Sequence, residues 1–218
     1  RIRRIDTTRA KKSPGVYTIL TGEDVRGILY GRGLRDVPIL AQDRVRFVGE
    51  RVAAVAAVDS DAAQKALELI DVEYEELAPV FDALDALDEN APILHPNVNE
   101  YVGLPKLLEK PSNAFARDTW ERGNLEQGFL DADLIVENTF TVARVHQAYL
   151  EPHSCLVWID EENRIQIWAP NKAPHGLKRS MAAGLGIPED QIRVNPTTIG
   201  GDFGGKGAAM DEPLCYFL

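Results

Sequence analysis

Short apolar stretches separated by turns run along the start of the chain and predict a compact α/β unit. Residues 16–20 are apolar and β-branched, as is typical of a strand. Residues 44–49 and 52–59 predict two further strands, and the second, VAAVAAV, is apolar enough to be buried on both faces. Residues 61–70 place their apolar side chains on one face of a helix, and residues 72–77 alternate as a strand.

The composition changes after this unit. Residues 82–90 are acidic, and residues 92–111 are interrupted by prolines, which break periodic structure. We therefore expect a first domain at residues 1–95, a linker at 96–112 and a second domain at 113–218.

The second domain has its own pattern of elements and contains no internal repeat. The predicted elements are a helix at 125–132, strands at 134–142, 154–160 and 164–169, a helix at 174–185 and a strand at 192–199. The polar turn Glu161-Glu162-Asn163 joins two of these strands as a hairpin. Glycines and Pro188 end the second helix. The fold class is therefore α/β (α+β), with two unlike modules in sequence.

Composition excludes several classes of function. The 218 residues are 44% hydrophobic and 27% charged, which is typical of a globular protein, and no apolar run approaches the length of a membrane span. The net charge of -10 argues against a nucleic-acid partner, because such proteins neutralise phosphates with clustered Lys and Arg. Cys155 and Cys215 are too few and too far apart for a CxxC metal site or an iron-sulfur cluster.

The termini carry two further indications. The basic start of the chain has no apolar core or cleavage site of a secretory signal, and cysteines are sparse, so we expect a cytoplasmic protein. Arg1 enters a strand-like stretch directly, and residues 211–218 stop inside an apolar, helix-like run. We therefore expect a longer parent protein.

The strongest indication of a functional site is the sequence GGDFGGKG at residues 200–207, between a predicted strand and an apparent helix beginning near Ala208. Glycines tolerate positive φ and let the backbone approach a ligand, and successive N–H groups at the start of a helix can bind an anion. Five glycines around Phe203 exceed what a tight turn requires, because each costs about 0.5–1 kcal/mol against alanine in regular structure. The loop is therefore a candidate ligand site.

One alternative is a nucleotide-binding phosphate loop. Gly200, Gly205 and Lys206 match the pattern G-x-x-x-x-G-K. The next residue, however, is Gly207, where such a loop needs a Ser or Thr hydroxyl for Mg²⁺, and the bulky Phe203 lies in the middle. The incomplete match makes this the weaker hypothesis.

The phrase IGGDFGGKG resembles the G-G-x-F-G-G-K cofactor loop of the xanthine dehydrogenase and aldehyde oxidase family. NKAPHGLKRSMAAGLGIPEDQIRV and VHQAYLEPHSCLVWI are similar to the segments that precede that loop. In the first half, LAQDRVRFVGERVAAVAAVDSDAAQKALELIDVEYEELAPVFD resembles the α/β hammerhead domain of the same family. The resemblance implies a hammerhead domain followed by the first part of a molybdenum-cofactor-binding α/β domain.

The resemblance also implies a role for each loop residue. The backbone of Phe203 and Gly204 would lie beside the molybdenum and face its oxo and dithiolene ligands. Gly200, Gly201 and Gly205 would shape the loop. All five are therefore expected to bind the cofactor, with Phe203 in the vicinity of the metal.

A departure from the family concerns a glutamine that hydrogen-bonds an oxygen on the metal. Alignment on Tyr149-Leu150-Glu151 places Val145 at that position. Gln147 is shifted by two residues, which in a strand keeps the same face, so it is a candidate substitute. Whether Gln147 replaces the usual glutamine aligned at Val145 stays open, and the departure puts xanthine-like substrate handling in doubt.

The family's general base is a glutamate near the far C-terminus, so no catalytic residue is expected before Leu218. The implied cofactor is molybdenum-molybdopterin, in its plain or cytosine dinucleotide form, and the 2Fe-2S and FAD groups belong to other domains or subunits. The implied reaction oxidises an electron-poor carbon of an aldehyde, N-heterocycle or related molecule, with water as the oxygen source. The complete assembly would be a dimer. An alternative is a hammerhead docking module for the iron-sulfur and FAD partners, without activity of its own.

Four other residues are weighed individually. His146 and His153 are seven residues apart, which is no metal-ligand spacing, so we expect hydrogen-bonded histidines. Cys155 lies in an apolar strand and is expected to be a buried, inert thiol. Glu151 follows an apolar strand and either braces the glycine-rich loop by accepting N–H bonds or is a plain strand-end carboxylate.

Overall fold

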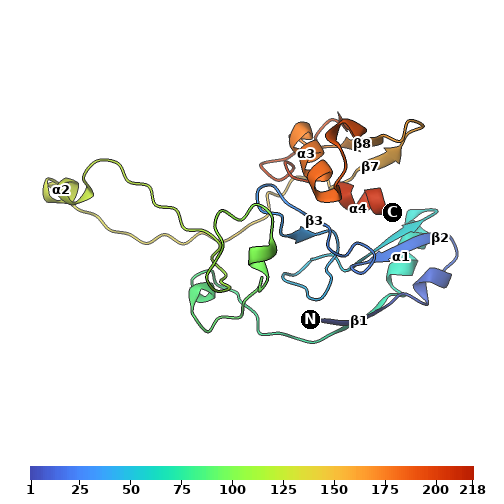
Figure 1. The fold of residues 1–218 in the computed structure, drawn as a ribbon, viewed down its shortest axis with the longest axis horizontal. Coiled ribbons are helices and arrows are strands. Elements are labelled where there is room, and N and C mark those ends of the chain that lie inside the picture. Colours follow the sequence, from blue (N-terminus) through green and yellow to red (C-terminus); the bar gives the residue numbers. More distant parts are fainter.

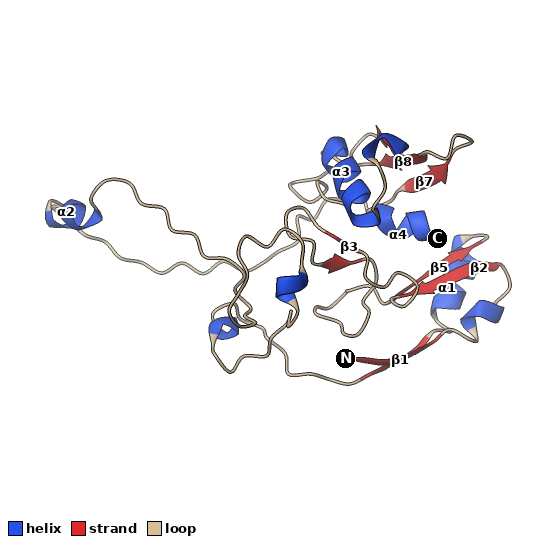
Figure 2. Ribbon diagram, in the orientation of Figure 1, coloured by secondary structure: helices blue, strands red, loops and turns tan.

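The chain folds into nine short strands and four α-helices, and the computed structural model describes all 218 residues (Figures 1 and 2). The strands are β1 (Ile2–Asp6), β2 (Val16–Thr21), β3 (Leu29–Tyr30), β4 (Val37–Pro38), β5 (Ala53–Ala57), β6 (Asp71–Tyr74), β7 (Leu156–Ile159), β8 (Ile165–Ala169) and β9 (Ile192–Pro196). The helices are α1 (Ser60–Leu67), α2 (Leu125–Leu130), α3 (Pro174–Leu185) and α4 (Glu212–Phe217). None of these helices has the length and apolarity needed to cross a membrane.

The first half is built from two-stranded antiparallel sheets. β1 pairs with β6, β2 with β5 and β3 with β4, so strands distant in sequence lie side by side. Asp59 caps α1 by accepting a hydrogen bond from the Ala62 N–H at 2.8 Å. A small core of Ala10, Ile19 and Ala66 lies between the helix and the strands. The predicted α/β unit is therefore confirmed.

Two predictions for this half are wrong. Residues 44–49 form no strand. β5 is not buried on both faces, since Ala54 is its one buried residue. Its other four residues are half-buried, because the two-stranded sheet of β2 and β5 packs against only the small core of Ala10, Ile19 and Ala66.

The C-terminal unit contains the main core. β7 and β8 form the predicted hairpin, and β8 pairs in parallel with β9 through the crossover helix α3. Helix α3 has the bounds that the sequence predicts and ends at Gly186, whose φ of 68° gives the left-handed cap. The largest fully buried apolar side chains here are those of Ile167, Leu177 and Met181.

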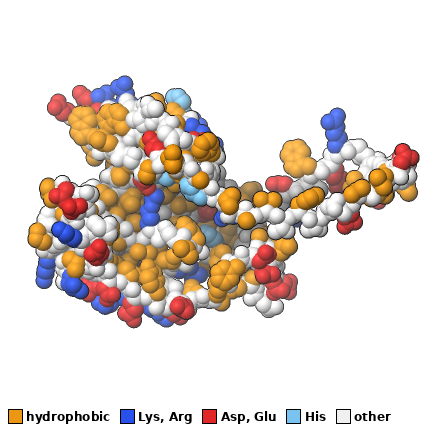
Figure 3. Space-filling model, turned by 180° about the vertical axis from the view of Figure 1, so that it is seen from behind, with side chains coloured by type: hydrophobic (Ala, Val, Ile, Leu, Met, Phe, Trp, Pro, Cys, Tyr) orange, Lys and Arg blue, Asp and Glu red, His pale blue; other side chains and the backbone are white.

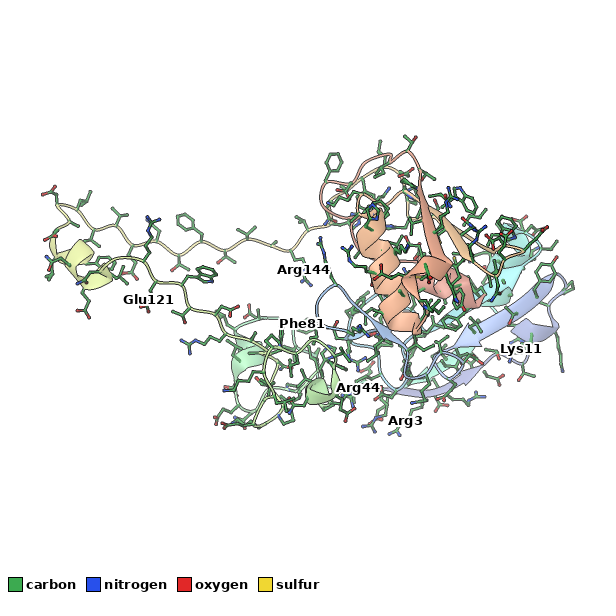
Figure 4. The ribbon with its side chains drawn as sticks, turned by 45° about the horizontal axis from the view of Figure 1, so that its top comes forward. Arg3, Lys11, Arg44, Phe81, Glu121 and Arg144 are labelled. Atoms are coloured by element: carbon green, nitrogen blue, oxygen red, sulfur yellow. The ribbon has the colours of Figure 1, made fainter.

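A long arm at residues 114–148 leaves the body and returns to it, with α2 at its tip (Figure 1). Every residue of this arm is exposed, and the side chains of Glu121 and Arg144 on its two sides are labelled in Figure 4. The predicted helix is confirmed, but the predicted strand at residues 134–142 is not formed. A strand needs a neighbour for its backbone N–H and C=O groups, and no segment lies beside this one.

The two halves pack against each other through both apolar and polar contacts. Val25, Ile39 and Leu40 form a buried cluster that Leu214 and Phe217 of α4 cover. Two arginines of the first half also donate to carbonyls of the second, Arg35 to Ala183 O at 2.9 Å and Arg51 to Met210 O at 2.8 Å. Beside this contact lies a cleft of about 1180 Å³, the hollow between the two lobes in Figure 3.

Limited tryptic digestion should cut the arm first. Arg117, Arg122 and Arg144 are exposed on backbone that makes no packed contact, so cleavage there needs no local unfolding. The linker expected from the sequence offers Lys106 as a matched site in the same digest, whereas Lys110 is followed by Pro111, which blocks tryptic cleavage. Mass spectrometry of early fragments distinguishes the two regions, and first cleavage at Lys106 would contradict the extended arm.

Candidate functional site

The glycine-rich loop at residues 200–207 connects β9 to α4. Its backbone has positive φ at three positions, with 104° at Gly201, 44° at Phe203 and 96° at Gly204. Positive φ is strained for a residue with a side chain, so Phe203 is held in this conformation by its surroundings. The helix that follows begins at Glu212 rather than near Ala208, so the loop is not the start of a helix, as the sequence suggested.

An ion pair with a buried lysine fixes one side of the loop. Lys206 is 1% exposed, and its Nζ donates to Oε2 of Glu151 at 2.5 Å. The same Nζ lies 4.7 Å from the centroid of the Tyr149 ring. The Gly200 N–H donates to Glu151 Oε2 at 2.8 Å. The hydrogen bond from Lys206, followed by that from Gly200, lowers the pKa of Glu151. Of the two roles that the sequence left open for this carboxylate, the structure shows the bracing one.

A second carboxylate, that of Asp202, fills the inner side of the loop. Its Oδ2 accepts from Lys172 Nζ at 2.8 Å and from the Gly204 N–H at 2.9 Å, and its Oδ1 accepts from the Lys206 N–H. Its backbone carbonyl accepts from the Gly205 N–H at 2.7 Å. The hydrogen bond from Lys172 is the largest cause that lowers the pKa of Asp202 to about 2.

These contacts exclude the phosphate-loop alternative. The N–H groups of Gly204, Gly205 and Lys206 are turned toward Asp202, which occupies the place that a phosphate would need. The Lys206 ammonium is buried against Glu151 and cannot reach a nucleotide. The prediction that successive N–H groups of this loop cradle an anion is therefore wrong for these three residues.

The outer side of the loop stays open. Phe203 is 75% exposed, and nothing lies within 4 Å of the position that a Cβ on Gly204 would take. The N–H groups of Gly201 and Phe203 donate to no group of the chain. A ligand could therefore approach the backbone of residues 201–204 from outside and meet these two donors.

Gln147 lies beside the loop. Its Oε1 is 3.2 Å from the position of a Cβ on Gly205, and the edge of the Tyr149 ring is 2.6 Å from that position. Glycine is therefore required at 205, because a methyl group would displace Tyr149. Val145 is 79% exposed on the arm. Of the two residues left open by the sequence, Gln147 is the one in contact with the loop.

The histidines around Tyr149 are hydrogen-bonded, as predicted. The Tyr149 hydroxyl lies within hydrogen-bond distance of His153 Nε2, and His146 Nε2 is 3.3 Å away. No three side chains among the His, Cys, Asp and Glu residues are placed to hold a metal ion. A metal at this site would have to arrive with ligands of its own.

The sequence profile of the molybdopterin cofactor-binding domain matches residues 107–218. The a/b hammerhead domain of aldehyde oxidase and xanthine dehydrogenase matches residues 1–78. The chain belongs to the xanthine dehydrogenase and aldehyde oxidase family. The two matches also confirm the order of the domains expected from the sequence.

Individual relatives agree with this membership. The chain is 30% identical to the xanthine dehydrogenase molybdenum-binding subunit of Escherichia coli O157:H7, over 98% of this chain and 28% of that protein. It is 31% identical to the nicotinate dehydrogenase large molybdopterin subunit of Eubacterium barkeri, over 100% of this chain and 48% of that protein. The structure of CO dehydrogenase from Oligotropha carboxidovorans matches with a TM-score of 0.83 and 30% identity, over 99% of this chain and 28% of that chain. The chain therefore spans about a quarter to a half of the length of these relatives.

The loop fits the cofactor that this family binds. A molybdopterin supplies sulfur ligands to its metal, so the protein needs open backbone and donors rather than a cluster of metal-binding side chains. The open face at Gly201, Phe203 and Gly204 provides both. Sequence reasoning missed Asp202 and Lys172, the residues that hold the loop. The available signal was Asp202 itself, an acidic residue enclosed by glycines.

Lys206→Met should destabilise the fold roughly twice as much as Lys172→Met, because the Lys206 side chain is 1% exposed and its charge is little screened by solvent, whereas the Lys172 side chain is 42% exposed. Chemical denaturation of both variants measures the difference. A phosphate loop would give the opposite pattern, with stability retained and affinity for ATP lost in Lys206→Met. Equal stability of both variants would contradict the structural role of the buried lysine.

The acidity of Asp202 should depend on Lys172. An NMR titration should give a carboxyl pKa of about 2 for Asp202, which returns toward 3.8 in Lys172→Met. Because folding lowers this pKa, the carboxylate stabilises the loop above pH 3.8, and that contribution is lost as the pH falls toward 2. Lys178→Met on the neighbouring helix α3 is the matched control and should leave the titration unchanged. An unshifted pKa in Lys172→Met would overturn the assignment.

Proposed function

We propose that this chain is part of a molybdenum hydroxylase-type oxidoreductase. The parent enzyme oxidises an electron-poor carbon, in an aldehyde, an N-heterocycle or a related small molecule, and takes the oxygen from water. The observation that carries the proposal is the loop itself, since its inner side is closed by Asp202 and Glu151 while its outer backbone is open. The family membership supports the reaction class.

The residues proposed to hold the molybdopterin are those of the open face and its support, namely Gly200, Gly201, Phe203, Gly204, Gly205 and Gln147. The bound cofactor supplies the oxygen transfer and accepts two electrons. The backbone N–H groups of Gly201 and Phe203 are placed to donate to it. The Gln147 side chain places its amide oxygen beside the loop. The Phe203 ring, 75% exposed beside the open backbone, is proposed to border the path of the substrate.

The general base and the rest of the pterin-binding surface are proposed to lie in other parts of the parent protein, as the family resemblance implies. The Eubacterium relative is named a large molybdopterin subunit, which supports a complex of several subunits. We propose partners that carry 2Fe-2S and FAD groups, because the two electrons must leave the molybdenum site. We also propose that the cofactor is in its cytosine dinucleotide form, that the complete assembly is a dimer and that it lies in the cytoplasm.

Two loop variants of the parent enzyme test this function. Phe203→Ala should keep most of its molybdenum and lose turnover about tenfold or more, since the backbone donors remain while the ring is lost. Gly204→Ala should instead lower molybdenum content by roughly half or more, because its φ of 96° strains any residue with a Cβ and moves the open backbone.

Gly27→Ala is the matched control. Gly27 has a φ of 80° and open space around its Cβ position, but it lies in a turn of the first half. It should therefore carry the same backbone strain while keeping molybdenum and turnover. Metal analysis and substrate-dependent dye reduction read out all three variants, and a parent enzyme unaffected by both loop substitutions would refute the site.

A further inference from the structure

The fold brings the two cysteines of the chain together. Cys155 lies immediately before β7 and Cys215 lies in α4, 60 residues further along the chain. Their sulfur atoms are 3.3 Å apart, and both are free thiols. Nothing in the sequence pattern indicated this pair, and the pattern predicted a buried, inert Cys155. Both thiols are in fact only partly buried, so a small reagent can reach them.

The surroundings hold the two sulfur atoms in this position. Helix α4 packs on β7, and Cys155 and Tyr216 both contact the main core. A disulfide bond has a length of about 2.05 Å, so closing it requires a movement of little more than about 1 Å. A movement of this size is comparable with a small adjustment of the two side chains.

We propose that Cys155 and Cys215 form a reversible redox modification site, closed to an intramolecular disulfide by exchange with a low-molecular-weight disulfide such as oxidised glutathione. The feature that carries the proposal is the 3.3 Å approach of two accessible thiols on separate packed elements. Nothing in the proposed hydroxylase chemistry uses either sulfur. The site is therefore additional to the cofactor loop.

The exchange proceeds in two balanced steps. The Cys215 thiolate attacks one sulfur of the small disulfide, which forms a mixed disulfide and releases one small thiol. The Cys155 thiolate then attacks Cys215 Sγ, forms the protein disulfide and releases the second small thiol. The protein loses two electrons and two protons, and the reagent gains them.

The order of attack follows from the hydrogen bond between the two sulfurs. Cys155 donates it, which lowers the pKa of Cys215 and raises that of Cys155. Arg51 favours the Cys215 thiolate, whereas burial and the carboxylates of Asp211 and Glu212 oppose it. Cys215 is therefore the first nucleophile and Cys155 the resolving thiol.

The disulfide would tie together the two segments that flank the loop. Cys155 follows Glu151, which holds Gly200 and Lys206. Cys215 follows Asp211, which pairs with Arg51 of the first half. The disulfide would therefore restrict the movement of the two segments that hold the loop and would leave the open face of the loop unchanged.

The test equilibrates the chain in glutathione buffers from reducing to oxidising. Oxidation should remove the mass of two hydrogens from the intact protein, and proteolysis should give one crosslinked product that contains Cys155 and Cys215. The thermal midpoint should rise by several degrees, because the bond closes a long loop. Dithiothreitol should reverse both changes.

Cys155→Ser and Cys215→Ser are the matched controls. Cys155→Ser should retain one glutathione on Cys215, Cys215→Ser should take up glutathione more slowly because only the resolving thiol remains, and neither should show the rise in midpoint. If either serine destabilises the fold, alanine at the same position serves as the control, and the crosslinked product of the wild-type chain still decides the question. Two thiols that stay free in the oxidising buffer, or wild-type protein that carries glutathione without crosslinking, would overturn the proposal.

Discussion

The geometry of the site depends on one ion pair, that between the buried Lys206 and the partly exposed Glu151. A buried ammonium is tolerated only when it is paired and its hydrogens are used, so this lysine fixes the position of the carboxylate that it meets. The carboxylate in turn holds Gly200, and the lysine lies over Tyr149. Glu151 therefore holds the loop at two points, Gly200 and Lys206, although Glu151 and Lys206 are 55 residues apart in the chain.

Asp202 completes this arrangement from inside. A loop with many glycines exposes N–H groups that attract anions, and an external phosphate would compete for them. Here the chain supplies its own anion, whose charge Lys172 balances. The N–H groups of Gly204, Gly205 and Lys206 are consequently satisfied before any ligand binds, and the part left open at Gly201, Phe203 and Gly204 is backbone rather than a charged pocket. That surface suits a cofactor held by close approach.

The sequence predicted those features that local periodicity determines. Helix α3 and the β7–β8 hairpin lie where the pattern placed them, because side-chain spacing and turn residues specify both. The strand at 134–142 was predicted from a similar pattern but needs a partner strand, which a local pattern does not contain. The ion pair of Lys206 and the approach of the two cysteines join residues 55 and 60 positions apart, and only the folded chain brings them together.

The contact between the halves extends the same constraint to the hammerhead domain. Arg51 donates to Met210 and pairs with Asp211, which lie directly after the glycine-rich loop. Glu151 holds the loop from its own domain, and Arg51 holds the segment that leaves it from the other. Because the loop is attached on both sides, a shift of the first domain would be transmitted to the loop through residues 207–211. The hammerhead domain therefore helps to position the candidate cofactor site, in addition to any partner that it contacts.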